Sequence, residues 1–583
     1  APFYTDDEGA SEALMAAGMA VARINTSHGT PEEHRAVLER VRRIDRERDG
    51  PVATMIDLQG PEIRTEALEQ GLTLSEGDTL SLVEGRGSGG DELGVSIDPT
   101  RLERDQAILF DDGRVEAVVT AVGGDAARVR IESGGRLEGR VGVNVPGVDP
   151  GLDVVTEPDE VALDLAVDLE VDFVAASFVA SGRDVLSVSE ALEARGATIP
   201  VIAKIERQRA FETLDDIVEA ADGVMIARGD LGVELPLENV PIIQKRIIRR
   251  CREAGVPTVT ATEMLDSMIE HTRPTRAEVS DVANAVLDET DAVMLSGETA
   301  IGDQPVAVVE TMNRILRAVE ASEEHAEQRD RQVPPPDRTH TDSLARSARF
   351  LARDVEADAI VVATESGYTA RRVAKFRPSV PIVAVTPTET TRRRLAIVRG
   401  VVPLVTTAGI DRTGDVIGTA LDRALNAGAI QTGDTVIALS GLISDIERET
   451  TDTLQVRVAA ERLGVGTGVV PGRASGVVAT PGTGDLEHLP EGAILYLAES
   501  FDDELTGRLT RIAGIIHERP GMTGYPAMIA REVGIPMVSG ASLPPAVRHG
   551  DIVSIDGSRG IIYRGDVVTR VLEGDRDEGG TRR

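Results

Sequence analysis

The sequence contains little lysine, few aromatic residues and almost no cysteine. Only three of its 62 basic residues are lysines, aromatic residues make up 2% of the chain, and tryptophan is absent. Hydrophobic residues nevertheless reach 41%, so the cores must be packed mainly with Val, Ile, Leu and Ala. No segment has the roughly 18 uninterrupted apolar residues of a membrane-spanning helix, and no basic, apolar leader opens the chain. These absences predict a cytoplasmic protein without a membrane partner.

The single cysteine, Cys251, excludes an internal disulfide and suits a reducing cytosol. It recurs at helical spacing with Ile243 and Ile247, which favours a buried packing role over a redox role.

Positive charge is scarce as well, and the formal net charge is −36. An excess of Asp and Glu with little Lys suggests adaptation to high salt, where screening is strong and carboxylates keep the surface hydrated. The alternative is a mesophilic acidic protein with a GC-rich coding bias. Such a surface argues against nucleic acid or an anionic membrane as a partner.

At 583 residues the chain is too long for one core, and three or four domains are expected. Over residues 1–66 and 148–325, short apolar runs alternate with helical patterns, which indicates βα units and a parallel sheet. The seven runs are VARIN, ATMID, DFVAASF, PVIAKI, GVMIA, PTVTA and AVMLS. They approach the eight strands of a TIM (β/α)8 barrel, and polar residues follow most of them, where such barrels place their chemistry. An open doubly wound sheet is the alternative.

The rest of the chain differs in character. Residues 67–147 have short strand-like runs, DDG and GG turn signals and no helical period, which predicts a small inserted β-barrel domain able to act as a lid. The charged, Pro-rich stretch 326–340 predicts a linker, and residues 341–460 a second α/β domain. Residues 468–566 predict a β-rich domain with one helix, and the tail 567–583 is expected to be disordered.

The stretch from IPVIAKIERQ to IARGDLG carries the clearest candidate site. Lys204 and Glu206 close one run, and Asp230 closes the next, 24 residues after Glu206. In a barrel both carboxylates can converge on one mouth, and two such ligands suit Mg²⁺, which keeps the rest of its octahedron for water and substrate. The alternative is a pair of structural carboxylates bonded to arginines.

Lysine scarcity draws attention to Lys204. A chain that uses Arg almost everywhere has kept a lysine beside a carboxylate. A compact ammonium fits where a guanidinium fork does not, and a phosphoryl group in transfer or an enolate oxygen needs such a charge nearby. Lys245 and Lys375 are expected to form surface or inter-element ion pairs.

Other candidates follow neighbouring runs. Glycines at the ARGDLG turn, Gly229 among them, can hold a carboxylate or phosphate through backbone N–H groups. Thr262 ends the next run, and two arginines, Arg23 and Arg64, can clamp a phosphoryl group. Ser296 and Glu298 end a further run, while Asn25, Ser27 and Asp57 offer the mixed oxygens of a monovalent cation site.

At these residues the sequence closely resembles pyruvate kinase, with an acidic composition similar to haloarchaeal members. The signatures IAKIERQ, IARGDLGVELP, TATEMLDSMIEHTRPTRAEVSDVANAVLDETDAVMLSGETA and TESGYTARRVAKFRPSVPIVAVTP stand in family order over most of the chain. The resemblance implies transfer of the phosphoryl group of phosphoenolpyruvate to ADP, giving pyruvate and ATP. It also implies a homotetramer in which the inserted domain closes as a lid.

The resemblance further implies a role for each candidate. Lys204 stabilises the transferring phosphoryl group and the enolate, while Glu206 and Asp230 ligate Mg²⁺ or Mn²⁺. The Gly229 and Asp230 amides hold the substrate carboxylate together with Thr262, which also lies on the proton route to the enolate carbon. By the same resemblance, Arg23 and Ser177 bind the substrate. The K⁺ ion is bound by Asn25, Ser27, Asp57 and the Leu58 carbonyl. The nucleotide is contacted by His28, Arg64 and Asn25.

Three departures from the family pattern bear on function. The family's first barrel strand, with its Thr-Ile-Gly-Pro segment, is missing before Ala1, and we expect a fragment because an open barrel would expose its core. The K⁺ site is mixed: Glu62 and Thr65 resemble K⁺-dependent members, whereas Leu58 and Gln59 resemble members in which a lysine replaces the counterpart of Glu62. With Glu62 no protein ammonium can replace the cation, so K⁺ dependence is expected. Glu447 and Glu449 disfavour fructose 1,6-bisphosphate as activator, and a sugar monophosphate or nucleotide effector stays open.

The last domain resembles the swivelling phosphohistidine domain of phosphoenolpyruvate-utilising enzymes. That pattern carries Thr-Ser-His before its helix, where this chain has Thr523, Gly524 and Tyr525. Without that histidine, and with His517 poorly placed, phosphohistidine chemistry is excluded. A structural or subunit-contact role is favoured, with regulation second.

Two other function classes stay open. An aldolase-type Mg²⁺ barrel can share the Glu/Asp pair but does not need the lid or the TATEM to SGETA segment. A non-enzymatic effector-sensing paralogue or inactive fragment is the other, and intact Lys204, Glu206, Asp230 and Thr262 argue against it.

Overall fold

The computed structural model describes residues 8–48, 50–68, 71–85, 91–111, 113–147, 153–406, 416–440, 451–481 and 485–567. The predictions about Glu447, Glu449 and the tail beyond residue 567 lie outside these residues. The chain forms two compact units. The first comprises Ala1–Asp337, Ala374–Arg377 and Glu389–Val401, and the second comprises Arg338–Val373, Pro378–Thr388 and Val402–Arg583.

A seven-stranded parallel sheet forms the centre of the first unit, and its strand order follows the chain. Each of the seven apolar runs forms one strand: β1 (Val21–Asn25), β2 (Ala53–Asp57), β11 (Phe173–Ala176), β12 (Val201–Ile205), β13 (Gly223–Ala227), β14 (Thr258–Ala261) and β15 (Ala292–Val293). An open doubly wound sheet reverses its strand order at a switch point, whereas this order never reverses. The TIM-barrel prediction is confirmed, and the doubly wound alternative is wrong.

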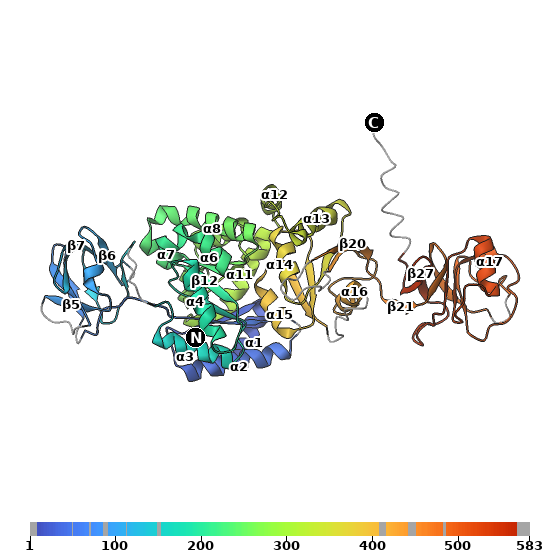
Figure 1. The fold of residues 1–583 in the computed structure, drawn as a ribbon, viewed down its shortest axis with the longest axis horizontal. Helices are drawn as coiled ribbons and strands as arrows, with labels where there is room; N and C mark the ends of the chain where they lie inside the picture. The colour runs from blue at the N-terminus through green and yellow to red at the C-terminus, as the bar shows by residue number, and fades with distance from the viewer. Residues whose placement is uncertain are drawn as a thin grey trace, which may run out of the picture. The chain divides into compact units, whose positions relative to one another are not determined.

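Helices cover the outside of these strands, with α4 packed on β12 and α8 on β13 and β14 (Figure 1). The helices of this unit are α1 (Glu8–Ala17), α2 (Pro31–Arg46), α3 (Glu157–Asp168), α4 (Gly182–Glu193), α5 (Gln208–Glu212), α6 (Leu214–Ala220), α7 (Arg228–Glu234), α8 (Val240–Ala254), α9 (Arg276–Leu287), α10 (Gly297–Ala300), α11 (Pro305–Glu320), α12 (Glu323–Arg331) and α15 (Glu389–Arg394).

Helix α8 shows how the sequence builds this outer layer. Ile243, Ile247 and Cys251 recur at helical spacing and are all buried in the core of the unit. The helix ends at Gly255, whose left-handed conformation (φ 74°) is the usual stop signal. The Cys251 side chain is fully buried in this core, so its predicted packing role is confirmed, and burial also raises the pKa of its thiol.

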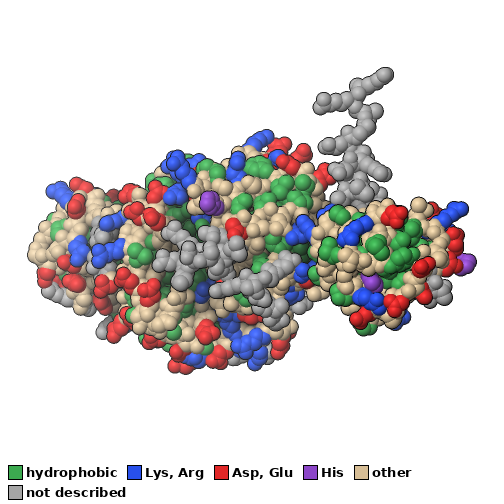
Figure 2. Space-filling model, turned by 45° about the vertical axis from the view of Figure 1, so that its right-hand side comes forward, with side chains coloured by type: hydrophobic (Ala, Val, Ile, Leu, Met, Phe, Trp, Pro, Cys, Tyr) green, Lys and Arg blue, Asp and Glu red, His purple; other side chains and the backbone are tan. Residues whose placement is uncertain are grey.

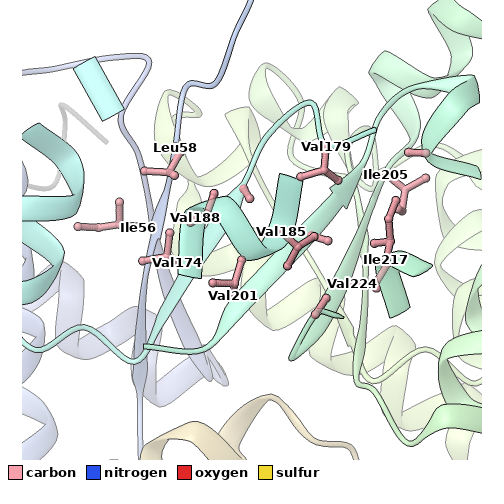
Figure 3. Close-up of a cluster of buried hydrophobic side chains, with 14 of the residues drawn as sticks. Ile56, Leu58, Val174, Val179, Val185, Val188, Val201, Ile205, Ile217 and Val224 are labelled. Atoms are coloured by element: carbon pink, nitrogen blue, oxygen red, sulfur yellow. The ribbon is translucent and has the colours of Figure 1, made fainter. Parts of the chain in front are cut away.

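The core between strands and helices is built from Val and Ile together with Leu and Ala (Figure 3). Ile56, Val174 and Val201 come from adjacent strands, and Val185 and Val188 come from helix α4. Strands covered on both faces need continuous apolar sequence, and every residue of β2, β11 and β13 is buried.

The inserted segment, residues 67–147, is mainly β-structured among its described residues, with one short 3-10 helix at Pro99–Arg101. Its strands are β3 (Leu72–Leu74), β4 (Thr79–Glu84), β5 (Glu92–Val95), β6 (Ala107–Phe110), β7 (Val115–Gly123), β8 (Ala126–Ser133), β9 (Gly135–Leu137) and β10 (Val143–Asn144). Six of them form one sheet in the order β10-β6-β7-β8-β4-β5, and β3 pairs with β9. Alternating residues such as Val115, Ala117 and Val119 fill a separate core.

The second unit contains two sheets. Strands β16 (Ala359–Ala363), β17 (Ile382–Thr386), β18 (Val401–Val405), β19 (Thr435–Ser440) and β20 (Thr453–Val458) form one, with helices α13 (His340–Asp354), α14 (Tyr368–Lys375) and α16 (Val416–Asn426). The other is an eight-stranded sheet with helix α17 (Tyr525–Val533), built from β21 (Arg462–Val465), β22 (Thr467–Val470), β23 (Arg473–Ala479), β24 (Ala493–Leu497), β25 (Ile512–His517), β26 (Met537–Ser539), β27 (Ile552–Asp556) and β28 (Ile561–Arg564). These strands and α17 match in kind the β-rich segment with one helix predicted from the sequence, but the sheet begins at Arg462, before the expected start at residue 468.

One expectation about local structure was wrong. The stretch from residue 326, expected to be a linker, begins inside helix α12, which Ser322 caps by accepting the His325 amide. The pattern gave no apolar period because the residue that α12 buries is His325.

Acidic and basic side chains are interspersed over the visible surface (Figure 2). No described helix combines the length and apolar character that crossing a bilayer requires.

Candidate active site

The candidate residues gather at the carboxyl ends of neighbouring parallel strands. Asn25 is the register partner of Asp57, and Asp57 in turn is paired with Ala175 of β11. On β12, Ile205 directly precedes Glu206, and it pairs with Ile226 of β13. Since all these strands run the same way, the residues that end them share one edge of the sheet, the catalytic face of such barrels.

Lys204 lies at the centre of this edge. Its Nζ donates to Ser177 Oγ at 2.7 Å and lies 2.8 Å from Glu206 Oε1 and 3.2 Å from Asp57 Oδ1. Arg23 reaches the second oxygen of Asp57, with Nε 2.6 Å from Oδ2. Two cations and two carboxylates therefore form one compact network.

Burial makes this network electrostatically strong. The side chains of Asp57 and Glu206 are 1% and 2% exposed, and that of Lys204 is 12% exposed. Burial opposes the charge on Lys204, but Asp57 and Glu206 outweigh it and raise the pKa of the ammonium above its ordinary value. Burial likewise opposes the charge on Asp57, yet Arg23 and Lys204 lower the pKa of its carboxyl. Lys204 and Asp57 therefore stay charged at neutral pH.

Ser177 links two strand ends. Its hydroxyl accepts from Lys204 Nζ and donates to the carbonyl of Leu58 at 2.7 Å. The sequence placed Ser177 near the substrate through resemblance alone, and its contact with Lys204 had no local signal because 27 residues separate them.

Glu206 is held from two sides. Oε1 contacts Lys204, and Oε2 accepts the backbone N–H of Phe178 at 2.6 Å. Sequence reasoning missed Phe178, because a backbone donor leaves no mark in the residue type.

Thr262 and Gly229 meet at the next two strand ends. The Gly229 N–H donates to Thr262 Oγ at 2.8 Å, and that hydroxyl donates to the Ala261 carbonyl at 2.7 Å. Asp230 follows in the first turn of α7. Arg228, which was also missed, donates to the Thr262 carbonyl at 2.7 Å and pairs with Asp281 at 2.7 Å, so it fixes the turn that carries Thr262.

The remaining candidates lie around the loops after β1 and β2. Asn25 Oδ1 accepts the Ser27 N–H at 3.1 Å, and the His28 carbonyl accepts from His34 at 2.7 Å while His28 itself is exposed. Arg64 bonds to Glu62 at 2.7 Å and to the Arg140 carbonyl at 2.9 Å, at the junction with the inserted segment. Arg23 and Asp57 therefore belong to the network around Lys204. The bonds described for Arg64 do not connect it to that network.

Two residues of the SGETA segment have structural contacts. The carboxylate of Glu298 is 1% exposed and accepts the amides of Leu265 and Ser296, at 3.1 and 2.6 Å. The predicted ion pairs of the other two lysines are confirmed, Lys245 with Asp288 and Lys375 with Asp337.

The donor chemistry fits a magnesium ion shared with substrate. Among the described residues there is no group of three or more His, Cys, Asp or Glu placed to hold a metal by themselves. A pair of carboxylates is enough for Mg²⁺, which takes its other oxygens from water and phosphorylated substrates.

Comparisons with known proteins agree along the chain. Residues 3–309 match the pyruvate kinase barrel domain, residues 342–457 the pyruvate kinase alpha/beta domain, and residues 489–560 the mobile domain of PEP-utilising enzymes. Pyruvate kinases from Geobacillus stearothermophilus and Bacillus licheniformis are 40% and 38% identical, each over 95% of both chains. A crystal structure of pyruvate kinase from Cryptosporidium parvum matches with a TM-score of 0.72 at 34% identity, over 78% of this chain and 94% of that one. The barrel, the lysine-centred network and these matches together show that the chain belongs to the pyruvate kinase family, enzymes that transfer the phosphoryl group of phosphoenolpyruvate to ADP.

Proposed function

We propose that Lys204 and Arg23 bind the phosphoryl group of phosphoenolpyruvate during its transfer. The observation that supports this most is the buried ammonium of Lys204, fixed by three acceptors within 3.2 Å at the mouth of the barrel. Such a preorganised charge stabilises negative charge that develops in the transition state without reorganising. The same ammonium then lies beside the enolate oxygen.

We assign Glu206 and Asp230 to a Mg²⁺ or Mn²⁺ ion. When bound, this ion neutralises the substrate carboxylate and the developing enolate charge. Glu206 is already oriented by two contacts, and Asp230 opens α7 beside the Gly229 amide. Gly229, Asp230 and Thr262 are the groups we propose to hold the substrate carboxylate, with Thr262 on the path of the proton to the enolate carbon.

A K⁺ site is proposed at Asn25, Ser27, Asp57 and the Leu58 carbonyl. These groups offer carboxylate, amide, hydroxyl and carbonyl oxygens at the ends of two paired strands. Glu62 is bonded to Arg64 and not to a lysine, which supports K⁺ dependence. Activity in KCl should exceed activity in NaCl at equal ionic strength, and equal rates would contradict the assignment.

Arg64, His28 and Asn25 are proposed to face ADP, with the inserted β segment closing over it as a lid. Arg64 stands at the start of that segment, bonded to its Arg140 carbonyl, which supports a place at the hinge. We further propose a cytoplasmic homotetramer adapted to high salt, in which the last domain serves a structural or subunit-contact role. The net charge of −36 supports the salt adaptation, and the absence of a histidine at Tyr525 supports the structural role.

ATP formation from phosphoenolpyruvate and ADP in molar KCl with Mg²⁺ tests the whole proposal. Activity that requires both cations is expected. The matched pair Glu206→Gln and Glu298→Gln distinguishes metal binding from structural support. Both carboxylates are buried, but Glu206 contacts Lys204, whereas Glu298 accepts the backbone amides of Leu265 and Ser296. Glu206→Gln should raise the Mg²⁺ concentration needed for activity, whereas Glu298→Gln should lower thermal stability and leave that concentration unchanged. Equal metal requirements in the two variants would contradict the metal assignment.

A further inference from the structure

Phe178, the second residue after β11, has a left-handed backbone with φ of 56°. A bulky side chain rarely adopts this conformation, because its Cβ approaches the neighbouring carbonyl. The conformation persists only where surrounding contacts enforce it, and such positions gather at functional sites.

Two neighbours enforce it here. The guanidinium of Arg207 covers the Phe178 ring, with Cζ 4.9 Å from the ring centroid. On the loop after β2, Gly60 approaches so closely that a Cβ there would lie 3.2 Å from Phe178 Cδ2 and 3.0 Å from the Ser177 carbonyl oxygen. The ring is therefore held by a cation on one side and by a backbone that admits no side chain on another.

The consequence of this conformation is the direction of one N–H group. The Phe178 amide donates to Glu206 Oε2 at 2.6 Å, while Lys204 occupies Oε1 at 2.8 Å. Bonds to both oxygens fix the plane of the carboxylate. Ser177 contacts Lys204 and Phe178 contacts Glu206, so the two residues that follow β11 orient both functional side chains at the end of β12.

We propose that Phe178, kept in its left-handed conformation by Arg207, is a positioning residue that sets the metal-binding orientation of Glu206. This inference rests on the proposed role of Glu206 as a metal ligand. Groups that orient a metal ligand from behind commonly contribute about tenfold to a hundredfold to metal affinity.

The test is direct Mn²⁺ binding, measured on the full chain without substrates from the electron paramagnetic resonance signal of free Mn²⁺. Phe178→Gly keeps the backbone amide but removes the ring through which Arg207 and Gly60 hold the left-handed conformation. The variant should raise the Kd for Mn²⁺ about tenfold or more. Arg207→Gln removes the cation above the ring and should change the Kd in the same direction. Phe178→Tyr keeps the ring and should bind Mn²⁺ like the unaltered protein.

Matched controls are available elsewhere in the chain. Glu356 is another left-handed residue (φ 49°), so Glu356→Gly relaxes the same conformation away from the site. Arg346 covers the Phe350 ring at the same 4.9 Å, so Arg346→Gln removes an equivalent contact. Both variants should leave the Kd for Mn²⁺ unchanged. In assays of ATP formation, Phe178→Gly should raise the Mn²⁺ activation constant more than it lowers kcat.

The outcomes separate this inference from the proposed function. If Phe178→Gly and Arg207→Gln bind Mn²⁺ normally while Glu206→Gln loses it, the positioning role is wrong and the metal assignment stands. Normal Mn²⁺ binding by Glu206→Gln overturns the metal assignment itself. If Phe178→Gly fails to fold, Arg207→Gln decides alone, and an unchanged Kd overturns the proposal.

Discussion

Replacing Lys204 by arginine tests the centre of the proposed site without removing its positive charge. Three acceptors lie 2.7 to 3.2 Å from Nζ, which matches the three N–H donors of an ammonium. A guanidinium is planar and larger, and at a side chain only 12% exposed it must displace its neighbours. Overpacking of this kind costs about 1–3 kcal/mol, and misplacing one preorganised hydrogen-bond donor costs roughly 2.7–4 kcal/mol of transition-state stabilisation.

Lys204→Arg should therefore lower kcat by about 10²- to 10³-fold while KM for phosphoenolpyruvate changes little. The assay is ATP formation at saturating Mg²⁺ and K⁺, together with thermal unfolding to confirm that the variant is folded. Lys245→Arg is the matched control, because Lys245 is 54% exposed and pairs with Asp288 on the outer helices. It should leave kcat unchanged. A kcat for Lys204→Arg equal to that of the control would refute the role of the ammonium.

Three further predictions concern other buried groups. Burial alone would raise the pKa of Glu289, but the nearby His325, 3.5 Å away, and the adjacent arginine charges lower it to about 2. The charged carboxylate therefore contributes on the order of 3 kcal/mol to stability above its ordinary pKa, and this contribution is lost as pH falls toward 2. Glu289→Gln should melt at a lower temperature than the unaltered protein at pH 7, with a gap that narrows in acid; a pH-independent gap would contradict this. Thr262→Val deprives the Gly229 N–H of its acceptor and should destabilise by about 1–3 kcal/mol and lower kcat. Thr262→Ser keeps the hydroxyl and should retain stability and kcat, and equal loss in both variants would show that the hydroxyl bond does not account for the effect. The thiol of Cys251 should resist thiol reagents until the protein is denatured, and reaction in the native state would show that the core around α8 opens.

The strands of the barrel were predictable because both of their faces are covered. A strand buried on both sides requires consecutive apolar residues, and the run ATMID is buried at every position. The same logic located the ends of these runs, where Lys204, Glu206 and Thr262 stand. Helix α12 escaped prediction because it buries His325 where a pattern search expects an aliphatic residue.

Contacts within the site were less accessible to sequence reasoning. The pairing of Lys204 with Glu206 follows from their spacing along one strand, but the Ser177 hydroxyl reaches Lys204 only because β11 and β12 are adjacent in the sheet. Left-handed conformations at Phe178 and Thr262 contradict the preference of both residue types, so only the folded surroundings can specify them. Local rules fail most clearly at the residues that orient functional groups.

The charge arrangement explains how such a site can stay folded and still accept an anionic substrate. Buried carboxylates are stable here because each faces a cation, Asp57 with Arg23 and Glu206 with Lys204. If Asp57 and Glu206 serve the metal cations, as proposed, then cation binding competes with these ion pairs and leaves the guanidinium and the ammonium available to the phosphoryl group. Cations and substrate should then strengthen each other's binding by the same factor, because the coupling between two sites is reciprocal. On this view Lys204, one of three lysines in an arginine-rich chain, is retained because its ammonium is compact. It fits between two carboxylates and a hydroxyl when no ligand is bound, and it would still reach the phosphoryl group once cations and substrate are bound.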